Sequence, residues 1–421
     1  MKKRSPHFLF VFFLLTISAA YAQQPAIQYF RPNDKTGLNI FEPSKETDVA
    51  YEDLKIRIGG AFALQYQALD HENDADNLIE LSNNFNLPSA NLDFDVQLYD
   101  GVRLHLRVYL SSRHHEETYV KGGYLQIDKL DFIKKDFLSN VMKNVTIKVG
   151  QMENNYGDTH FRRSDNAHTL FNPFVGNYIM DSFTTEIGGE VYYQNNGIIA
   201  MVGATNGRLN QSVSNTATKG ALLAKVGYDK QFNDDLRFRI TGSLYTVNNT
   251  NTTYLYGGDR AGSRYFQVMD LASGTSNDFS GRIDPELNTD MTSIMVNPFV
   301  KFKGFEFFGV FENTKGRSDV TDFTFTGDRS WTQLGAEALY RFGPEENLYV
   351  GARYNSVSGQ LPGVEDDKVS VDRINVGAGW FMTKNILTKV EYVTQSYNDY
   401  TSLQFQGGKF SGLMIEAVIA F

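Results

Sequence analysis

Apolar and polar residues alternate in many short segments along this chain. In 102–112, for example, Val102 and Leu104 alternate with Arg103 and His105. Strict alternation is typical of a β-strand whose two faces meet different surroundings, because successive side chains point to opposite faces. Sixteen such segments are found, at 54–68, 90–98, 102–112, 118–128, 144–150, 187–195, 198–205, 220–231, 236–247, 291–302, 305–314, 331–342, 347–356, 371–382, 386–396 and 410–421. The pattern predicts an all-β chain of about 16 strands.

The connections between these segments alternate between short and long. Two residues separate some neighbours, as at Asn196-Gly197 and Lys303-Gly304, whereas 248–290 separates another pair. One connection on the short side, 129–143, is longer and predicts a short amphipathic helix. Short periplasmic turns, long outer loops and an even number of strands are typical of transmembrane β-barrels. We therefore predict a single transmembrane antiparallel β-barrel over residues 53–421, with both chain ends on the periplasmic side.

Two hairpins fix the expected pairing of neighbouring strands. A three-residue turn that ends in Gly101 keeps the lumen-facing residues of both strands on one face, and glycine suits its left-handed position. The lumen-facing pairs are then Gln97–Arg103, Asp95–His105 and Asp93–Arg107. A two-residue turn at Lys303-Gly304 gives the pairs Phe302–Phe305 outside and Lys301–Glu306 inside. Outward aromatic residues near the short turns form the expected interfacial girdle, namely Phe302, Phe305, Tyr340, Phe342, Trp380 and Phe421.

The first 22 residues have the features of an export signal. Three basic residues precede an apolar run at 8–17, and Ala20-Tyr21-Ala22 fits a cleavage site. The apolar run is about half the ~20 residues of a membrane-spanning helix. We therefore expect residues 1–22 to be a cleaved signal peptide and the mature protein to lie in the outer membrane of a Gram-negative cell.

Charge and cysteine content narrow the function classes further. The full chain has a formal net charge of −9, and loss of residues 1–22 removes three basic residues and no acidic one, which leaves −12. Such an acidic chain argues against nucleic acid as a partner. The chain has no cysteine, so it offers neither disulfides nor thiolate metal sites.

Residues 23–52 precede the first strand and show no period. They include Ile27-Gln28-Tyr29-Phe30-Arg31-Pro32 and Asn39-Ile40-Phe41, and they are polar and rich in turn-forming residues. We interpret them as a periplasmic N-terminal segment. The alternative is a segment that folds into the mouth of the barrel.

The long connection at 151–186 is the candidate pore constriction. A structureless connection of this length is unusual and is commonly functional. It is the third outer loop, the position at which porins fold a loop inward, and its aromatic and methionine residues suit packing on the barrel wall. The charged residues left to line the pore are Asp158, His160, Arg162, Arg163 and Asp165. The alternative is a loop outside the pore, in which case deletion of 158–178 would leave conductance unchanged instead of raising it.

The inward face of the predicted wall carries more basic than acidic residues. A sixteen-stranded barrel is wide enough to leave an aqueous channel, in which rows of charge decide selectivity. The lumen basic row comprises Arg103, His105, Arg107, Lys148, Arg237 and Arg239, and the inward set also includes Lys303. Acidic residues gather in predicted outer loops, as at 70–76 and Glu365-Asp366-Asp367. We predict a modest anion preference; the alternative is that wall charges pair across strands and only solvate the lumen.

Few residues suggest metal or catalytic chemistry. The acidic stretch 70–76 could hold Ca²⁺ through oxygen ligands, but it lacks the glycine and terminal glutamate of an EF-hand loop, which favours a solvated loop. His114-His115 has no identifiable third ligand. No Ser/His/Asp constellation is found, and His105 is predicted to face the lumen. We therefore expect no metal, no cofactor and no catalytic residue, and hence no enzyme.

The end of the chain resembles a known family of porins. Residues 375–381 (Asn-Val-Gly-Ala-Gly-Trp-Phe), the turn through Asn385 and Val390-Glu391-Tyr392-Val393 are similar to the phosphate-selective porins of O and P type. Val145-Thr-Ile-Lys-Val-Gly150-Gln151 resembles the strand that leads into the constriction loop of that family. The resemblance implies a sixteen-stranded, trimeric channel with a phosphate-like preference.

The predicted function is passive diffusion of small polar or anionic solutes through an outer-membrane porin. The last strand, 410–421, alternates and ends in Phe421, which resembles the C-terminal signal for the barrel-assembly machinery. Outer-membrane lipid and lipopolysaccharide are the other expected partners. The alternative is a barrel that acts mainly as a surface binding protein through its long 248–290 loop, which carries Tyr254, Tyr256, Tyr265 and Phe266.

Overall fold

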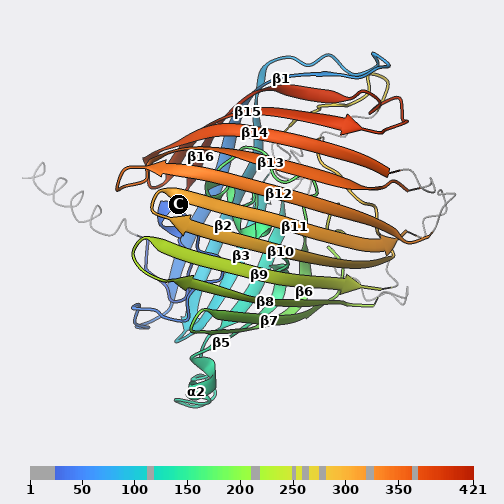
Figure 1. Ribbon diagram of the computed structural model, residues 1–421. Helices are drawn as coiled ribbons and strands as arrows, with labels where there is room; N and C mark the ends of the chain where they lie inside the picture. The colour runs from blue at the N-terminus through green and yellow to red at the C-terminus, as the bar shows by residue number, and fades with distance from the viewer. Residues whose placement is uncertain are drawn as a thin grey trace, which may run out of the picture.

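Sixteen antiparallel strands form a closed β-barrel in the computed structural model of the chain (Figure 1). Each strand pairs with its neighbours in sequence, and β1 pairs with β16 to close the barrel. The strands are β1 (Lys55–Glu72), β2 (Asn84–Tyr99), β3 (Val102–Leu110), β4 (Thr118–Ile127), β5 (Val145–Glu153), β6 (Thr185–Asn195), β7 (Ile198–Thr205), β8 (Ala221–Gln231), β9 (Leu236–Val247), β10 (Asp290–Phe302), β11 (Phe305–Arg317), β12 (Arg329–Phe342), β13 (Leu348–Gln360), β14 (Lys368–Thr383), β15 (Ile386–Asn398) and β16 (Lys409–Ala420). The predicted all-β fold, a single antiparallel barrel of about 16 strands, is confirmed.

The structure describes residues 24–110, 118–209, 219–248, 253–257, 265–274, 281–318, 327–362 and 368–421. The predicted signal peptide, His114-His115 and Glu365-Asp366-Asp367 lie outside these ranges. Helical elements are short: the 3-10 turns Lys35–Gly37, Thr159–Arg162 and Thr169–Phe171, and the helix α2 (Ser139–Met142). Over the described ranges, no helix is both long and apolar enough to cross a membrane.

The predicted hairpin registers are those of the structure. The aligned pairs are Gln97–Arg103, Asp95–His105 and Asp93–Arg107 in one hairpin, and Phe302–Phe305 and Lys301–Glu306 in the other. Side-chain contacts follow this register only in part, because Lys301 donates to Glu346 Oε2 at 2.6 Å rather than to Glu306. The inward assignment of Lys303 is wrong. This residue lies in the turn with a φ of 53°, outside the alternation of the strands, and its side chain is 64% exposed.

Several strands continue past their predicted ends on the side of the outer loops. β1 runs to Glu72, and β13 runs to Gln360 before the chain returns in β14 from Lys368. Backbone pairing continues there while the residues become polar, so the alternation that marks a strand in the sequence ends before the strand does.

The connection between β4 and β5 is mostly turns rather than the helix predicted for 129–143. Only Ser139–Met142 is helical. Asp136 and Leu138 have φ values of 58° and 51°, and a left-handed residue interrupts the repeating geometry of a helix. The predicted helix is therefore reduced to one turn.

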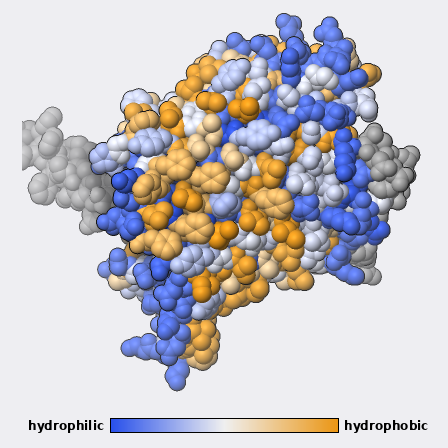
Figure 2. Space-filling model, in the orientation of Figure 1, coloured by the Kyte–Doolittle hydropathy of each residue, from blue (hydrophilic) through white to orange (hydrophobic). Residues whose placement is uncertain are grey.

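Outward apolar side chains form a band across the barrel face in Figure 2. Val202, Val226 and Ile374, which lie on three different strands, are 63%, 64% and 47% exposed. The six residues of the predicted girdle are all exposed, by between 41% and 50%. An apolar surface of this extent fits a hydrocarbon environment.

The lumen along β10–β16 is filled by an apolar core. Inward residues of these strands pack against the third outer loop (154–184) and against the described parts of the fifth outer loop (253–257, 265–274 and 281–289). The wall contributes Met295, Phe299, Phe308, Trp331, Val357, Val371, Val393 and Met414, and the loops contribute Tyr156, Val175, Tyr178, Ile179, Met180, Leu255, Tyr256, Tyr265, Val268 and Met269. The width of a sixteen-stranded barrel predicts an aqueous channel, but loops occupy this part of it.

Candidate functional site in the barrel lumen

Asp158 anchors the third outer loop to the barrel wall. Its carboxylate accepts hydrogen bonds of 2.8 Å from Arg239 Nε and Nη2 and from Thr241 Oγ1, and Lys225 Nζ lies 3.0 Å away. These partners are inward residues of β8 and β9. Burial alone would raise the pKa of Asp158, but the charges of Arg239 and Lys225 outweigh burial and hold that pKa below its ordinary value. Asp158 is therefore an ionised, fixed anchor.

Gly157 allows the loop to approach the wall at this point. Its φ is 66°, a left-handed conformation that glycine adopts readily. A Cβ added to Gly157 would lie 2.2 Å from Met295 Sδ on β10. A larger residue would therefore move the loop, the methionine or both.

Arg162 bridges two carboxylates on a different part of the wall. Its Nη2 lies 2.7 Å from Glu306 Oε1 of β11 and 2.6 Å from Glu337 Oε1 of β12, and its Nη1 donates to Asn39 Oδ1 at 2.6 Å. Burial alone would lower the pKa of Arg162, but Glu306 and Glu337 raise it above its ordinary value. The loop thus pairs an acidic residue, Asp158, with basic residues of the wall, and a basic residue, Arg162, with acidic residues of the wall.

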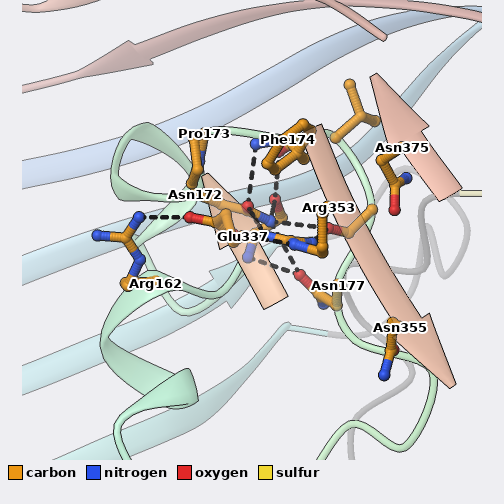
Figure 3. A network of polar contacts seen from close by, with 12 residues as sticks. Arg162, Asn172, Pro173, Phe174, Asn177, Glu337, Arg353, Asn355 and Asn375 are labelled. Atoms are coloured by element: carbon orange, nitrogen blue, oxygen red, sulfur yellow. Dashed lines mark hydrogen bonds and ion pairs between the residues drawn. The ribbon is translucent and has the colours of Figure 1, made fainter. Parts of the chain in front are cut away.

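The wall also satisfies backbone groups of the loop between residues 169 and 180. Arg353 donates to Gly176 O at 2.7 Å. It also pairs with Glu337 at 2.6 Å, and Figure 3 shows Arg353, Glu337 and Arg162 together. Further contacts of this kind are Lys389 Nζ with the carbonyls of Thr169, Asn172 and Phe174, Val175 N with Glu391, Ile179 N with Asn355 and Met180 N with Gln333. Buried backbone groups need partners, and a loop that is mostly irregular finds them on the strands.

The other predicted constriction residues are also paired. Their contacts are Asp165–Lys121, Asp165–Arg163 (3.2 Å), Arg163–Asp181 (2.8 Å), His160–Glu153 and His160–Asn155 (3.0 Å). All five predicted residues of the loop are at most 4% exposed. Their charges are therefore matched by close partners, and they hold the loop in place.

The N-terminal segment (24–54) crosses the lumen at the short-turn end of the barrel. Its contacts involve wall residues from widely separated strands and turns: Gln28 with Gln97 and Asp100, Asn33 with Gly60, Lys35 with Asn347 and the Lys384 carbonyl, Asn39 with Glu306, Glu42 with Arg239, and Lys45 with Asp128. The segment therefore contacts the barrel around most of this end.

Glu42 and Arg31 join this segment to the third outer loop. Glu42 lies 2.8 Å from Arg239, the residue that also holds Asp158. Burial alone would raise the pKa of Glu42, but Arg239 and Lys225 hold it well below its ordinary value. Arg31 donates to the Phe161 carbonyl at 3.2 Å, and its guanidinium carbon lies 3.8 Å from the centre of the Phe171 ring. Segment and loop therefore form one packed unit.

An open cavity of about 140 Å³ lies between this unit and the wall formed by β1–β6. Its basic lining residues are Arg31, Arg57, Arg103, Arg107, Lys121 and Lys148, and its acidic ones are Glu42, Asp93, Asp95 and Glu153. His105, His160 and His168 also line it. Four members of the predicted basic row therefore face this cavity. The other two, Arg237 and Arg239, lie on β9 away from it and bind Asp229 and Asp158.

Three basic side chains at the cavity, Arg31, Arg57 and Lys148, have no carboxylate partner among the described residues, and Arg31 donates to the carbonyls of Gly37 and Phe161 instead. Arg107 pairs with Asp93 at 2.8 Å, and Asp95 binds both Arg103 and His105. In contrast, no acidic residue of the described ranges lies within ion-pair distance of Arg57 or Lys148. Instead, Arg57 lies 5.2 Å from the Phe30 ring, and Lys148 lies 4.9 and 5.5 Å from the rings of Tyr192 and Tyr124. The cavity therefore has positive charge that no close carboxylate of the described ranges cancels.

Some lumen residues are not predicted by the alternation of inward and outward residues. Arg107 lies opposite Gly122 while Val108 lies opposite Val120, so Lys121 is the extra residue of a β-bulge and departs from the alternation. Glu153, Glu186 and Glu416 also contact inward groups, which reduces the predicted basic excess of the lumen. Arg31 and Glu42 lie in the aperiodic N-terminal segment, where no spacing marks them.

The outer loop residues proposed for partner binding are mostly turned inward. Tyr256 and Tyr265 are 3% and 2% exposed and donate to Glu312 and Glu391 at 2.8 Å, whereas Tyr254 is 39% exposed. Among the residues with described positions, which include 70–76, no three His, Asp or Glu side chains are grouped to hold a metal ion.

Comparison with known proteins shows likeness in fold rather than in sequence. No protein-family model and no curated protein matches the chain. Among solved structures, it is similar to an anion-selective porin from Comamonas acidovorans (12% identity, TM-score 0.53, 88% of this chain and 100% of that one). It is also similar to the outer membrane channel DcaP of Acinetobacter baumannii (14%, 0.52, 88% and 98%) and to the trimer form of the outer membrane protein OmpT of Vibrio cholerae (11%, 0.52, 88% and 100%). The fold is that of outer-membrane porins and channels.

Proposed function

We propose that the protein is an outer-membrane porin through which small polar solutes diffuse passively, with a mild preference for anions. The proposed route follows the wall of β1–β6, past the cavity that this wall shares with the third outer loop and the N-terminal segment. The observation that carries the proposal is the lining of this cavity, with six basic and four acidic side chains. Selectivity in a water-filled pore follows from such rows of charge.

We assign the constriction to the third outer loop and the N-terminal segment together. Asp158, His160, Arg162, Arg163 and Asp165 keep their proposed place at the constriction, but their close partners make them supports of the loop. The charges of Arg57 and Lys148 are better suited to attract an anion, because they lie beside the cavity and no carboxylate of the described residues pairs with them. Long-range attraction from such charges weakens as salt screens them.

Planar-bilayer recording tests the proposal. The mature protein is expected to conduct, with a reversal potential in a KCl gradient that favours chloride, and more strongly at low salt. Added inorganic phosphate is expected to compete with chloride for the route if the resemblance to phosphate-selective porins extends to the solute. Cation preference would overturn the anion assignment. A folded barrel without conductance would overturn the porin assignment and favour a binding protein.

Export and assembly are part of the same proposal. We infer cleavage after Ala22, recognition of the C-terminal strand by the barrel-assembly machinery, contact with lipopolysaccharide and assembly as a homotrimer. Phe421 supports the role of the last strand, because its backbone exchanges hydrogen bonds of 3.0 and 3.1 Å with Gly60 where the barrel closes. N-terminal sequencing of the mature protein and light scattering in detergent test cleavage and oligomeric state.

A further inference from the structure

The connection between β4 and β5 exposes an unusual number of apolar side chains. Over 129–143, the exposed apolar residues are Phe132, Ile133, Phe137, Leu138 and Val141, with exposed fractions between 37% and 60%. Internal hydrogen bonds give the connection its own shape, including those from Ile133 N to Leu130 O and from Val141 N to Leu138 O. These side chains are therefore presented on an ordered surface.

The position of this connection suits a membrane surface. It lies at the short-turn end of the barrel, the end that carries the aromatic girdle. Figure 1 shows α2 projecting sideways beyond β5 instead of across the mouth. In Figure 2 the hydrophobic residues of this projection lie on its side toward the lipid-facing band, and hydrophilic residues lie on the opposite side.

Charge indicates which part of a membrane it would meet. Lys134, Lys135 and Lys143 are exposed beside the apolar residues. Apolar side chains combined with lysines are typical of segments that lie in the headgroup region of a bilayer, where the lysines meet lipid phosphates. Val149 of β5 is 52% exposed and continues the apolar surface toward the band.

We propose that residues 129–143 form an interfacial anchor that inserts its apolar side chains into the headgroup region of the phospholipid leaflet on the short-turn side. Anionic phospholipids strengthen this contact through the three lysines. The occupant is a lipid surface, because the apolar side of the projection is continuous with the lipid-facing band. The anchor does not depend on conduction, so it stands or falls separately from the porin assignment.

Fluorescence labelling tests the anchor directly. The chain has no cysteine, so Ile133→Cys gives a single site for the fluorophore NBD in the full-length protein. In vesicles of phosphatidylethanolamine and phosphatidylglycerol, label at 133 is expected to emit at shorter wavelength than label at Asp234→Cys in another short turn. It is also expected to be quenched by headgroup-region spin-labelled lipid and protected from iodide. Asp234 is exposed at the same end of the barrel and provides the matched control.

The same label distinguishes the other outcomes. Equal spectra and equal iodide quenching at 133 and 234 would overturn the anchor. Protection from iodide without lipid quenching, together with cross-linking between copies through residue 133, would assign the surface to a protein contact and also overturn it. Lipid quenching of the label at 133 is expected to be stronger in vesicles that contain phosphatidylglycerol than in vesicles of phosphatidylcholine. Exchange of Lys134, Lys135 and Lys143 for Gln is expected to remove most of this difference. The control variant Lys384→Gln is expected to retain the difference. Unchanged quenching in the triple variant would overturn the role of charge.

Discussion

Arg239 and Asp158 form a two-pronged ion pair that joins strand β9 to the third outer loop. Both hydrogen bonds, Nε to Oδ2 and Nη2 to Oδ1, are 2.8 Å long, and both side chains are fully buried. Because a bidentate pair fixes direction as well as distance, it holds the loop in one register on the wall. Glu42 shares Arg239, so the N-terminal segment depends on the same guanidinium.

Asp158→Asn is expected to loosen the third outer loop and to raise conductance. The variant leaves the buried charges of Arg239 and Lys225 with less compensation, and loss of one partner of a buried pair typically costs about 3–5 kcal/mol. We expect larger and noisier single-channel currents and a lower temperature for loss of the native band on semi-native gels. The double variant Asp158→Asn with Arg239→Gln should recover part of the thermal loss, because it removes the unpaired charge. Currents identical to those of the parent would show that the pair does not hold the constriction.

The strands could be predicted from the sequence because they depend on local rules. Alternation gave each strand its two faces, and the left-handed residue Gly101 set the register that aligns Asp95 with His105. The inward position of Lys121 could not be predicted in this way, because a β-bulge interrupts the alternation and leaves no signal of its own in the sequence. Asp158 and Arg162 pair with wall residues of distant strands, and no spacing in the sequence shows these partners.

The filled part of the lumen depends on contacts between distant segments, which no period shows. One signal was present in β10, where Met295 and Phe299 are apolar and face inward while Ile294 and Val300 are apolar on the other face. A strand that is apolar on both faces is usually covered on both. Loop residues such as Tyr178 cover the inward face of these strands, and the sequence around Tyr178 has no alternation or other period that predicts this contact.

Lys148→Gln and Arg57→Gln are expected to weaken anion preference more than changes at paired positions. These side chains carry charge at the cavity and pair with no carboxylate in the part of the chain that the structure describes, so their loss changes the local charge directly. A fully anion-selective pore gives about 59 mV in a tenfold salt gradient. We expect each variant to move the reversal potential toward zero, and the double variant to move it further. Lys303→Gln, in an exposed turn, is the matched control and should leave the potential unchanged. Equal shifts of the reversal potential in the single variants Lys148→Gln, Arg57→Gln and Lys303→Gln would show that the cavity does not set selectivity.

Deletion of residues 24–45 from the mature chain is expected to enlarge the conductance. The segment contacts wall residues across the short-turn end, including Gln97 and Glu306, and its removal opens that end without removing any strand. Currents should increase severalfold if the segment narrows the route, while circular dichroism should retain the β signal of the parent. The milder variant Asn39→Ala with Glu42→Gln should give an intermediate increase. Parent-like currents after deletion would place the narrowest point elsewhere.

His168 is expected to make the folded state sensitive to acid. Burial lowers the pKa of His168 to about 3, with Glu153 opposing this effect and Arg31 and Arg107 adding to it. Unfolding restores the ordinary value of 6.5, so below that pH the unfolded chain binds a proton that the folded chain does not, and stability falls as pH falls toward 3. In this window the free energy of unfolding falls by up to about 1.4 kcal/mol per pH unit, or by about 2 kcal/mol between pH 6.5 and pH 5. His168→Gln keeps a neutral polar side chain and should remove the contribution of His168 to the pH dependence of the free energy of unfolding. Urea unfolding midpoints at pH 7 and pH 5 measure the difference, and an equal loss in parent and variant would show that His168 is not the group that titrates.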